Sequence, residues 1–94
     1  MKILLTGGAG YVGSACLRWL LHHGHDPIAY DNLVEGNVAA VPDASNRLIV
    51  GDIAESDRLA QVLREHRIEA VMHFAALASV WPESISAQTK LRTG

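Results

Sequence analysis

Hydrophobic residues in this 94-residue chain follow two patterns, short continuous runs and helical spacing. Continuous apolar runs closed by glycine or polar residues are typical of strands buried on both faces of a parallel sheet. Four such runs are predicted to be strands, and they cover residues 2–5, 27–30, 48–50 and 70–74.

Helical spacing separates these strands in two places. The first helix is predicted to begin at Gly10 and to stop near Gly24, which can adopt the left-handed conformation that ends helices. The second helix is predicted to be capped near Glu55 or Ser56 and to run to about His66.

The first helix is predicted to be amphipathic, with one apolar and one polar side. Apolar residues recur at three- and four-residue intervals and predict the face that packs on the sheet: Val12, Ala15, Cys16, Trp19 and Leu20. The polar side is predicted to hold Ser14, Arg18 and His22. Cys16, the only cysteine, is interpreted as a small buried hydrophobic residue that forms no disulfide.

The order of these elements is strand, helix, strand, loop, strand, helix, strand. The loop, residues 32–46, is predicted to contain at most one helical turn, around residues 38–41. Right-handed crossovers fold this order into an α/β structure. We expect half of a Rossmann fold, with a parallel sheet of about four strands in the order 3-2-1-4 and helices on both faces.

Three glycines between the first strand and the first helix are the strongest functional signal. Gly7 would allow the tight turn, Gly10 would let backbone approach a pyrophosphate, and Gly13 would let the helix pack closely on the sheet. The pyrophosphate would then meet the positive end of the helix dipole. The spacing and context predict a dinucleotide-binding loop.

Two acidic residues follow the second and third strands. Asp31 lies 18 residues after Gly13, close to the spacing of the carboxylate that binds the adenosine ribose hydroxyls. That carboxylate would repel a 2′-phosphate, so NAD is favoured over NADP. The alternative is that Asp31 and Asn32 simply form a turn. Asp52 can equally be a turn residue or a hydrogen-bond partner of the adenine amino group.

Composition excludes several other classes of protein. The 8 basic and 10 acidic residues are scattered, so no basic surface for nucleic acid is expected. The apolar start of the chain breaks at Thr6, too early for a signal peptide or a membrane span, so a cytoplasmic protein without a membrane partner is expected. His22, His23 and His25 are interpreted as a polar helix end, and no metal site is predicted.

Four ordered motifs resemble the UDP-glucose 4-epimerases, members of the extended short-chain dehydrogenase/reductase family. The motifs are residues 2–14, Asp31-Asn32-Leu33, Gly51-Asp52-Ile53 and His73-Phe74-Ala75-Ala76-Leu77. The resemblance covers roughly residues 1–85 and implies NAD as the cofactor. Other nucleotide-sugar epimerases and dehydratases share much of the pattern.

The resemblance also implies which residues would contact NAD. Backbone groups of Tyr11 and Val12 would meet the pyrophosphate. The ribose would be surrounded by residues 31–36, which include Asn32, Leu33 and Gly36. Adenine would meet Asp52 and Ile53, and the crevice beside the fourth strand would be lined by Phe74, Ala75, Ala76 and Ala78.

The chain departs from the family pattern at two places near its end. Many of these epimerases carry a lysine at the position of Ala78, so its absence is expected to weaken NAD binding. The step Trp81-Pro82 holds one residue more than the family's usual spacing, and Trp81 would either stack on a base or cover the edge of the core.

The family's catalytic residues are not found in the sequence. Its chemistry requires a tyrosine followed four residues later by a lysine, and neither Tyr11 nor Tyr30 has one. No catalytic residue is therefore assigned. We expect residues 1–94 to form a truncated NAD-binding domain that is not catalytic alone. A non-enzymatic nucleotide-binding module and an inert folded remnant are the alternatives.

The predicted sheet also leaves one apolar edge without a partner. The fourth strand, which starts at Ala70 and ends at Phe74, would lie at that edge, where further strands can add. A homodimer that joins two such edges across a two-fold axis, or a companion chain that supplies the missing half, is the expected partner.

Overall fold

The computed structural model describes residues 1–75 and contains one parallel sheet of four strands in the order β3-β2-β1-β4. The strands are β1 (Lys2–Thr6), β2 (Asp26–Asp31), β3 (Leu48–Val50) and β4 (Ala70–His73). The helices are α1 (Tyr11–His22), α2 (Ala44–Arg47) and α3 (Ser56–Glu65), with a 3₁₀ turn η1 (Val38–Ala40). The predicted strand order is confirmed.

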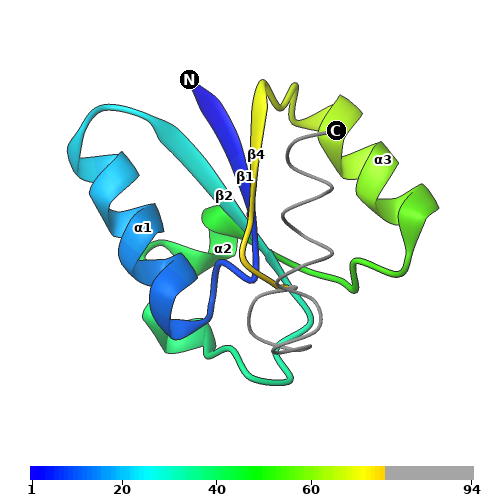
Figure 1. The fold of residues 1–94 in the computed structure, drawn as a ribbon. Coiled ribbons are helices and arrows are strands. Elements are labelled where there is room, and N and C mark those ends of the chain that lie inside the picture. The colour runs from blue at the N-terminus through cyan, green and yellow to red at the C-terminus, as the bar shows by residue number, and fades with distance from the viewer. Residues whose placement is uncertain (76–94) are drawn as a thin grey trace, which may run out of the picture.

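The sheet is covered on both faces, with α1 on one side and α3 on the other (Figure 1). Alternation along the central strand β1 explains this arrangement, because successive side chains point to opposite faces. Leu5 packs in the cluster that includes α1, whereas Leu4 packs with Val62 of α3. Both leucines are completely buried, so β1 is the centre of the core.

The predicted buried face of α1 is only partly correct, since Leu20 is buried as expected but Ala15 is exposed. Val12 and Trp19 are 61% and 56% exposed, and Ser14, which was expected on the polar side, is 3% exposed. The buried stripe combines Leu20 with Gly13 and Leu17, which are spaced for one side of a helix. Cys16 is half-buried at the border of this stripe, where it packs against the core, and burial raises the pKa of its thiol.

The loop between β2 and β3 contains more helix than predicted. Besides the 3₁₀ turn η1, it holds the single-turn helix α2, which begins after Asp43 in the left-handed conformation (φ 54°). Arg47 ends α2 and donates to the Asp26 carboxylate and to the Pro27 carbonyl. These contacts with β2 hold the turn in place. The expected end of α1 is confirmed, because Gly24 has a φ of +82°.

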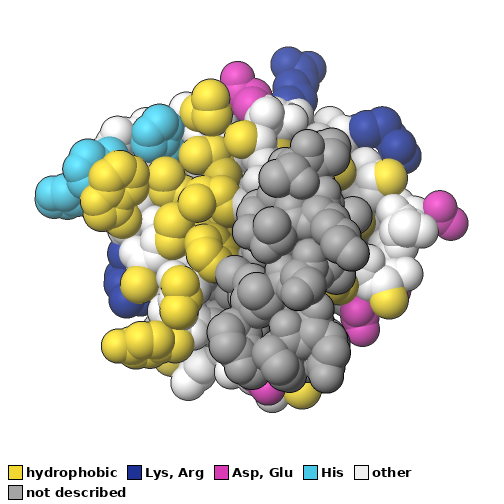
Figure 2. Space-filling view, in the orientation of Figure 1, with side chains coloured by type: hydrophobic (Ala, Val, Ile, Leu, Met, Phe, Trp, Pro, Cys, Tyr) yellow, Lys and Arg dark blue, Asp and Glu magenta, His cyan; other side chains and the backbone are white. Residues whose placement is uncertain are grey.

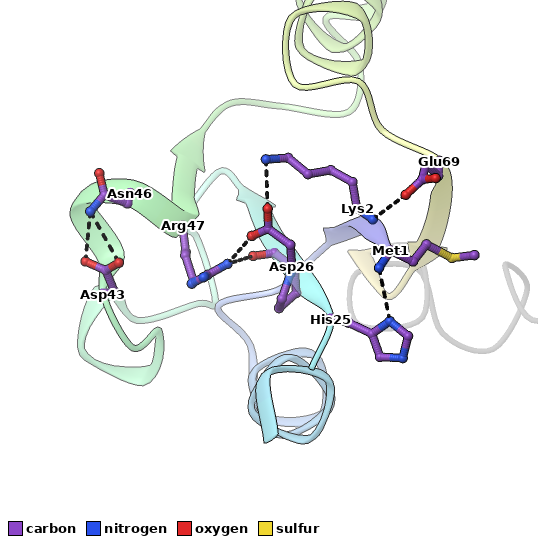
Figure 3. Close-up of polar contacts among 9 residues, drawn as sticks. Met1, Lys2, His25, Asp26, Asp43, Asn46, Arg47 and Glu69 are labelled. Carbon is purple, nitrogen blue, oxygen red and sulfur yellow. Dashed lines mark hydrogen bonds and ion pairs between the residues drawn. The ribbon is translucent and has the colours of Figure 1, made fainter. Parts of the chain in front are cut away.

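Charged groups join the elements at the amino end of the sheet (Figure 3). The Asp26 carboxylate lies between the Lys2 ammonium, at 2.9 Å, and the Arg47 guanidinium. The Lys2 backbone N–H also donates to Glu69, just before β4, at 2.7 Å. Hydrogen bonds from Lys2 and Arg47 lower the pKa of Asp26, which is half-exposed. This cluster connects β1, β2 and α2.

Among residues 1–75, no helix is long and apolar enough to cross a lipid bilayer.

The observed face of α1 makes a stability prediction. Leu17→Ala should lower the free energy of unfolding by about 2–5 kcal/mol, because it removes a fully buried side chain and leaves a cavity. Val12→Ala, on the same helix, should change it by less than about 0.5 kcal/mol. Urea unfolding of both variants provides the measurement. A larger loss for Val12→Ala would support the face expected from periodicity.

Candidate functional site

Two cavities share a border at the carboxyl end of the sheet, and both are lined by Gly7, Gly10 and Glu35. The larger has a volume of about 440 Å³ and the smaller about 320 Å³. The larger is also lined by Tyr30, Asp31, Asn32, Val34, Gly36, Gly51, Asp52, Ile53 and Ala75. The smaller is also lined by Tyr11, Val12, Gly13 and Phe74.

The glycine loop is built by close approaches that side chains would prevent. Gly7 has a φ of +70°, and a Cβ there would lie 2.7 Å from the backbone nitrogen of Ala75. A Cβ on Gly13 would lie 2.2 Å from the Gly7 carbonyl oxygen, so α1 can press against the loop only at a glycine. The predicted turn at Gly7 and the close packing at Gly13 are therefore present in the structure.

Gly10 differs from the other two glycines of the motif. Its φ of −78° suits any residue, and a Cβ would meet only the Gly7 oxygen, at 3.3 Å. A side chain at Gly10 would therefore require only a small shift of the Gly7 carbonyl, and it would partly fill the two cavities. The absence of a side chain there keeps the space open at the start of α1.

The amino end of α1 is suited to an anion. Gly10 is the N-cap and supplies no side-chain acceptor, and the first turn contains no acidic residue. The first N–H groups of a helix have no partner within the helix, and they lie at the positive end of its dipole. Tyr11, Val12 and Gly13 are in this turn and line the smaller cavity. An anionic group in that cavity would meet their N–H groups.

The carboxylate of Asp31 is 7% exposed and accepts two backbone hydrogen bonds. One comes from the N–H of Ala9 at 3.0 Å and the other from the N–H of Leu33 at 2.8 Å. The bond from Leu33 closes a turn at Asp31 and Asn32, which is the alternative that the sequence left open. The bond from Ala9 attaches the glycine loop to the end of β2.

Asp52 forms a turn as well. Its carboxylate accepts from the N–H of Ala54 at 2.9 Å, and its own N–H donates to Glu55 at 3.0 Å. Because Asp52 also lines the larger cavity, the turn leaves a contact with adenine possible.

The two cavities bring together most of the residues predicted to bind a dinucleotide. Leu33 lines neither; it has a φ of 64° and packs against the core on the α1 side. Ala76, Ala78 and the Trp81-Pro82 step lie outside the described residues.

Sequence reasoning missed two lining residues, Tyr30 and Gly51, whereas Val34 and Glu35 lie within the predicted range 31–36. Tyr30 is completely buried, and its hydroxyl donates to the Asp52 carbonyl at 3.0 Å. Burial raises the pKa of this phenol. A Cβ on Gly51 would lie 2.5 Å from the same hydroxyl, so Gly51 makes room for Tyr30. The one available signal was position, since Tyr30 and Gly51 directly precede the predicted residues Asp31 and Asp52.

The charged side chains among the described lining residues of the two cavities are all acidic. Asp31, Glu35 and Asp52 line the larger cavity, and no lysine or arginine is among the described lining residues of either cavity. A bound anion would therefore depend on backbone N–H groups, and an added phosphate beside these carboxylates would be repelled. Residues 1–75 contain no group of three His, Cys, Asp or Glu side chains arranged to hold a metal ion.

Thr6 and His73 join β1 to β4 next to the glycine loop. The Thr6 hydroxyl and Nδ1 of His73 share a hydrogen bond, and the two residues are partners in the sheet register. The N–H of Phe74 donates to the Thr6 carbonyl at 2.9 Å, which continues this pairing to the edge of the smaller cavity. Burial lowers the pKa of His73, so its imidazole stays neutral near pH 7.

Comparison with known families agrees with this geometry. Residues 3–92 match the model of the NAD dependent epimerase/dehydratase family. The chain belongs to this family. Family membership accounts for the glycine loop, the acid at the end of β2 and the strand order. The resemblance to UDP-glucose 4-epimerases is confirmed.

Individual family members support the same assignment. The chain is 52% identical to the UDP-glucose 4-epimerase of Corynebacterium glutamicum over 80 residues, which are 85% of this chain and 23% of that enzyme. It is 42% identical to the UDP-glucose 4-epimerase of Lactobacillus helveticus over 90 residues, 96% of this chain and 27% of the relative. The chain thus spans about a quarter of the length of these relatives.

Solved structures of the family share the fold. The UDP-glucose 4-epimerase of Thermus thermophilus, crystallised with NAD, matches with a TM-score of 0.77 and 36% identity over 85% of this chain and 25% of that one. The enzyme of Brucella ovis, also in complex with NAD, matches with a TM-score of 0.77 and 35% identity over 95% and 26% of the two chains.

The partly buried Thr6–His73 pair predicts a pH dependence of stability. The folded state lowers the pKa of His73 below its ordinary value of 6.5, so below that pH the unfolded chain binds more protons. The free energy of unfolding should fall as pH falls from 6.5 towards the folded pKa. Urea unfolding at pH 7.5 and pH 5.5 measures the effect. His73→Gln should reduce the difference, whereas His22→Gln, at the exposed end of α1, should not. Equal pH profiles for both variants would contradict this assignment.

Proposed function

We propose that residues 1–94 form an NAD-binding unit, the cofactor-binding portion of a UDP-glucose 4-epimerase-like enzyme, and that this portion is not catalytic by itself. One observation carries the proposal: the glycine loop opens two joined cavities at the amino end of α1, beside a carboxylate at the end of β2. Family membership and the NAD complexes of two structural relatives support the choice of ligand.

The proposed binding mode follows from the groups around the cavities. The pyrophosphate would lie against the first N–H groups of α1, next to Gly10. The larger cavity would take the adenosine, with Asp31 accepting hydrogen bonds from the ribose hydroxyls and Asp52 and Ile53 beside adenine. NAD itself supplies the chemistry of the family by accepting and returning a hydride. The residues described here bind and orient it.

The claim that this portion is not catalytic by itself rests on the missing tyrosine–lysine pair. No tyrosine in the sequence is followed four residues later by a lysine, so the chain offers no base of the kind the family resemblance requires. A non-enzymatic nucleotide-binding module and an inert remnant differ from each other in one measurable property, the affinity for NAD.

Calorimetric titration tests the nucleotide site. The chain should bind NAD in the micromolar range and NADP at least about tenfold more weakly, because a 2′-phosphate would meet the Asp31 carboxylate. Gly10→Val should weaken NAD binding at least about tenfold, since its side chain would enter both cavities. Ala15→Val, which introduces the same side chain on the exposed side of α1, should leave the affinity unchanged.

Two results would contradict the proposed site. Absence of NAD binding by the folded chain would favour the inert remnant. Equal affinities of the Gly10→Val and Ala15→Val variants would place the ligand elsewhere on the protein.

We also propose that the chain associates with a second copy through the edge of β4. Within the described residues β4 pairs only with β1, and Val71 on it is 50% exposed. Apolar side chains gather on the face over α1 next to the undescribed residues (Figure 2). An unpaired strand next to apolar surface favours association. A companion chain on the same edge is the alternative.

Sedimentation analysis tests this edge with a matched pair of variants. The chain should be dimeric at high micromolar concentration, and Val71→Lys should make it monomeric, because two charged edges would repel each other. Val50→Lys places the same charge on a residue of similar exposure, 51%, on the opposite edge strand β3 and should leave the dimer intact. A monomeric parent chain, or a dimer broken only by Val50→Lys, would contradict the proposal.

A further inference from the structure

The Asp31 carboxylate is bonded to the protein's own backbone. Oδ2 accepts from the N–H of Ala9 in the glycine loop, and Oδ1 accepts from the N–H of Leu33. Both bonds are to a buried ionised acceptor, the kind of hydrogen bond that contributes most to stability. The acid predicted to bind ribose is thus also a structural partner of the loop predicted to bind phosphate.

Ala9 is held from its other side as well. The N–H of Asn37 donates to the Ala9 carbonyl at 3.0 Å, and Ala9 is 2% exposed. Its N–H and its carbonyl are therefore both bonded to the segment of residues 31–37. We call this pair of bonds, from Ala9 to Asp31 and to Asn37, the Ala9 clamp.

Gly36 allows the segment to approach this closely. A Cβ on Gly36 would lie 2.8 Å and 2.9 Å from the two carboxylate oxygens of Asp31 and 2.9 Å from the Cβ of Ala9. Any larger residue would push the carboxylate, the glycine loop or both away. The Ala9 clamp thus requires a glycine at position 36, five residues after Asp31.

The clamp acts on the part of the loop that the anion would meet. Ala9 directly precedes Gly10, which caps α1 and lines both cavities. Fixing the Ala9 peptide fixes where the chain enters α1 and where its first N–H groups point. No cationic side chain is among the described residues that line the cavities, so the direction of these N–H groups decides how well an anion is held.

We propose that Asp31 is a positioning residue for pyrophosphate binding, acting through the Ala9 clamp, in addition to any bond that it makes with ribose. A carboxylate has about four acceptor positions, so two backbone bonds leave capacity for hydroxyl groups. The inference rests on the proposed NAD site. Beyond that site, it predicts that loss of the Asp31 charge weakens binding of the phosphates even when the ribose carries no hydroxyl groups.

A pair of nucleotides separates the two roles of Asp31. ADP carries the ribose hydroxyls, and 2′,3′-dideoxy-ADP lacks both. Asp31→Asn leaves one acceptor oxygen for two N–H donors, so one bond is lost. By calorimetry it should weaken ADP binding about tenfold or more, and the same factor should persist with 2′,3′-dideoxy-ADP. A factor that falls to about one with the dideoxy nucleotide would overturn the inference and leave Asp31 as a ribose ligand alone.

Amide hydrogen exchange tests the clamp without any ligand. Exchange at the N–H groups of Ala9 and Asn37 should accelerate in Asp31→Asn, and more in Asp31→Ala, which removes both acceptors. Asp52→Asn is the matched control, because Asp52 lines the same cavity but bonds to Ala54 and not to the glycine loop. It should leave both amides unchanged. Amides at the centre of β1 report whether each variant remains folded.

The two measurements distinguish the possible failures. If the parent chain binds neither nucleotide, the proposed NAD site is contradicted, and the exchange data alone decide whether the clamp exists. If Ala9 and Asn37 exchange at the parent rate in folded Asp31→Ala, the clamp is absent and the inference is overturned, whatever the nucleotide affinities.

Discussion

The close contact between Gly13 and the carbonyl of Gly7 is the constraint on which the site depends. A Cβ at position 13 would lie 2.2 Å from the Gly7 oxygen, so only glycine lets α1 start this close to β1. The contact fixes which side of α1 faces the sheet, because Leu17 and Leu20 follow on the same stripe. It also places the first turn of α1 at the smaller cavity. Both the packing of α1 on the core and the position of the ligand site therefore depend on the contact between Gly13 and Gly7.

The strands could be predicted from continuous apolar runs, and their order from the alternation of strands and helices with right-handed crossovers. The face of α1 could not, because the helix has apolar residues on two stripes. Val12 and Trp19 form the more hydrophobic one, yet they are exposed. The decisive residue was Gly13, whose close contact with Gly7 outweighs side-chain hydrophobicity. Close packing at Gly13 was predicted, and the buried face follows from it, because Leu17 and Leu20 lie four and seven residues further along the helix.

The missed helix α2 illustrates a different limit. Four residues are too few to show periodicity, and their helical turn is held by Arg47, which reaches back to Asp26 across 21 positions of sequence. Long-range contacts also explain the errors in the site. Leu33 follows Asp31 in the motif but packs into the core, whereas Glu35 lines both cavities because residues 31–37 fold back onto the glycine loop. Motif spacing located the site but could not give the path of this segment.

The ion cluster of Lys2, Asp26 and Arg47 lies at the opposite end of the strands from the cavities. Strands β1 and β2 contain 5 and 6 residues, and at about 3.3 Å per residue they separate the two regions by roughly 15–20 Å. That separation exceeds the screening length of about 8 Å at physiological ionic strength. The electrostatic potential at the nucleotide cavities is thus insulated from the amino end of the sheet. Surface charge could be redesigned there to improve solubility or crystallisation without retuning the affinity for a charged ligand.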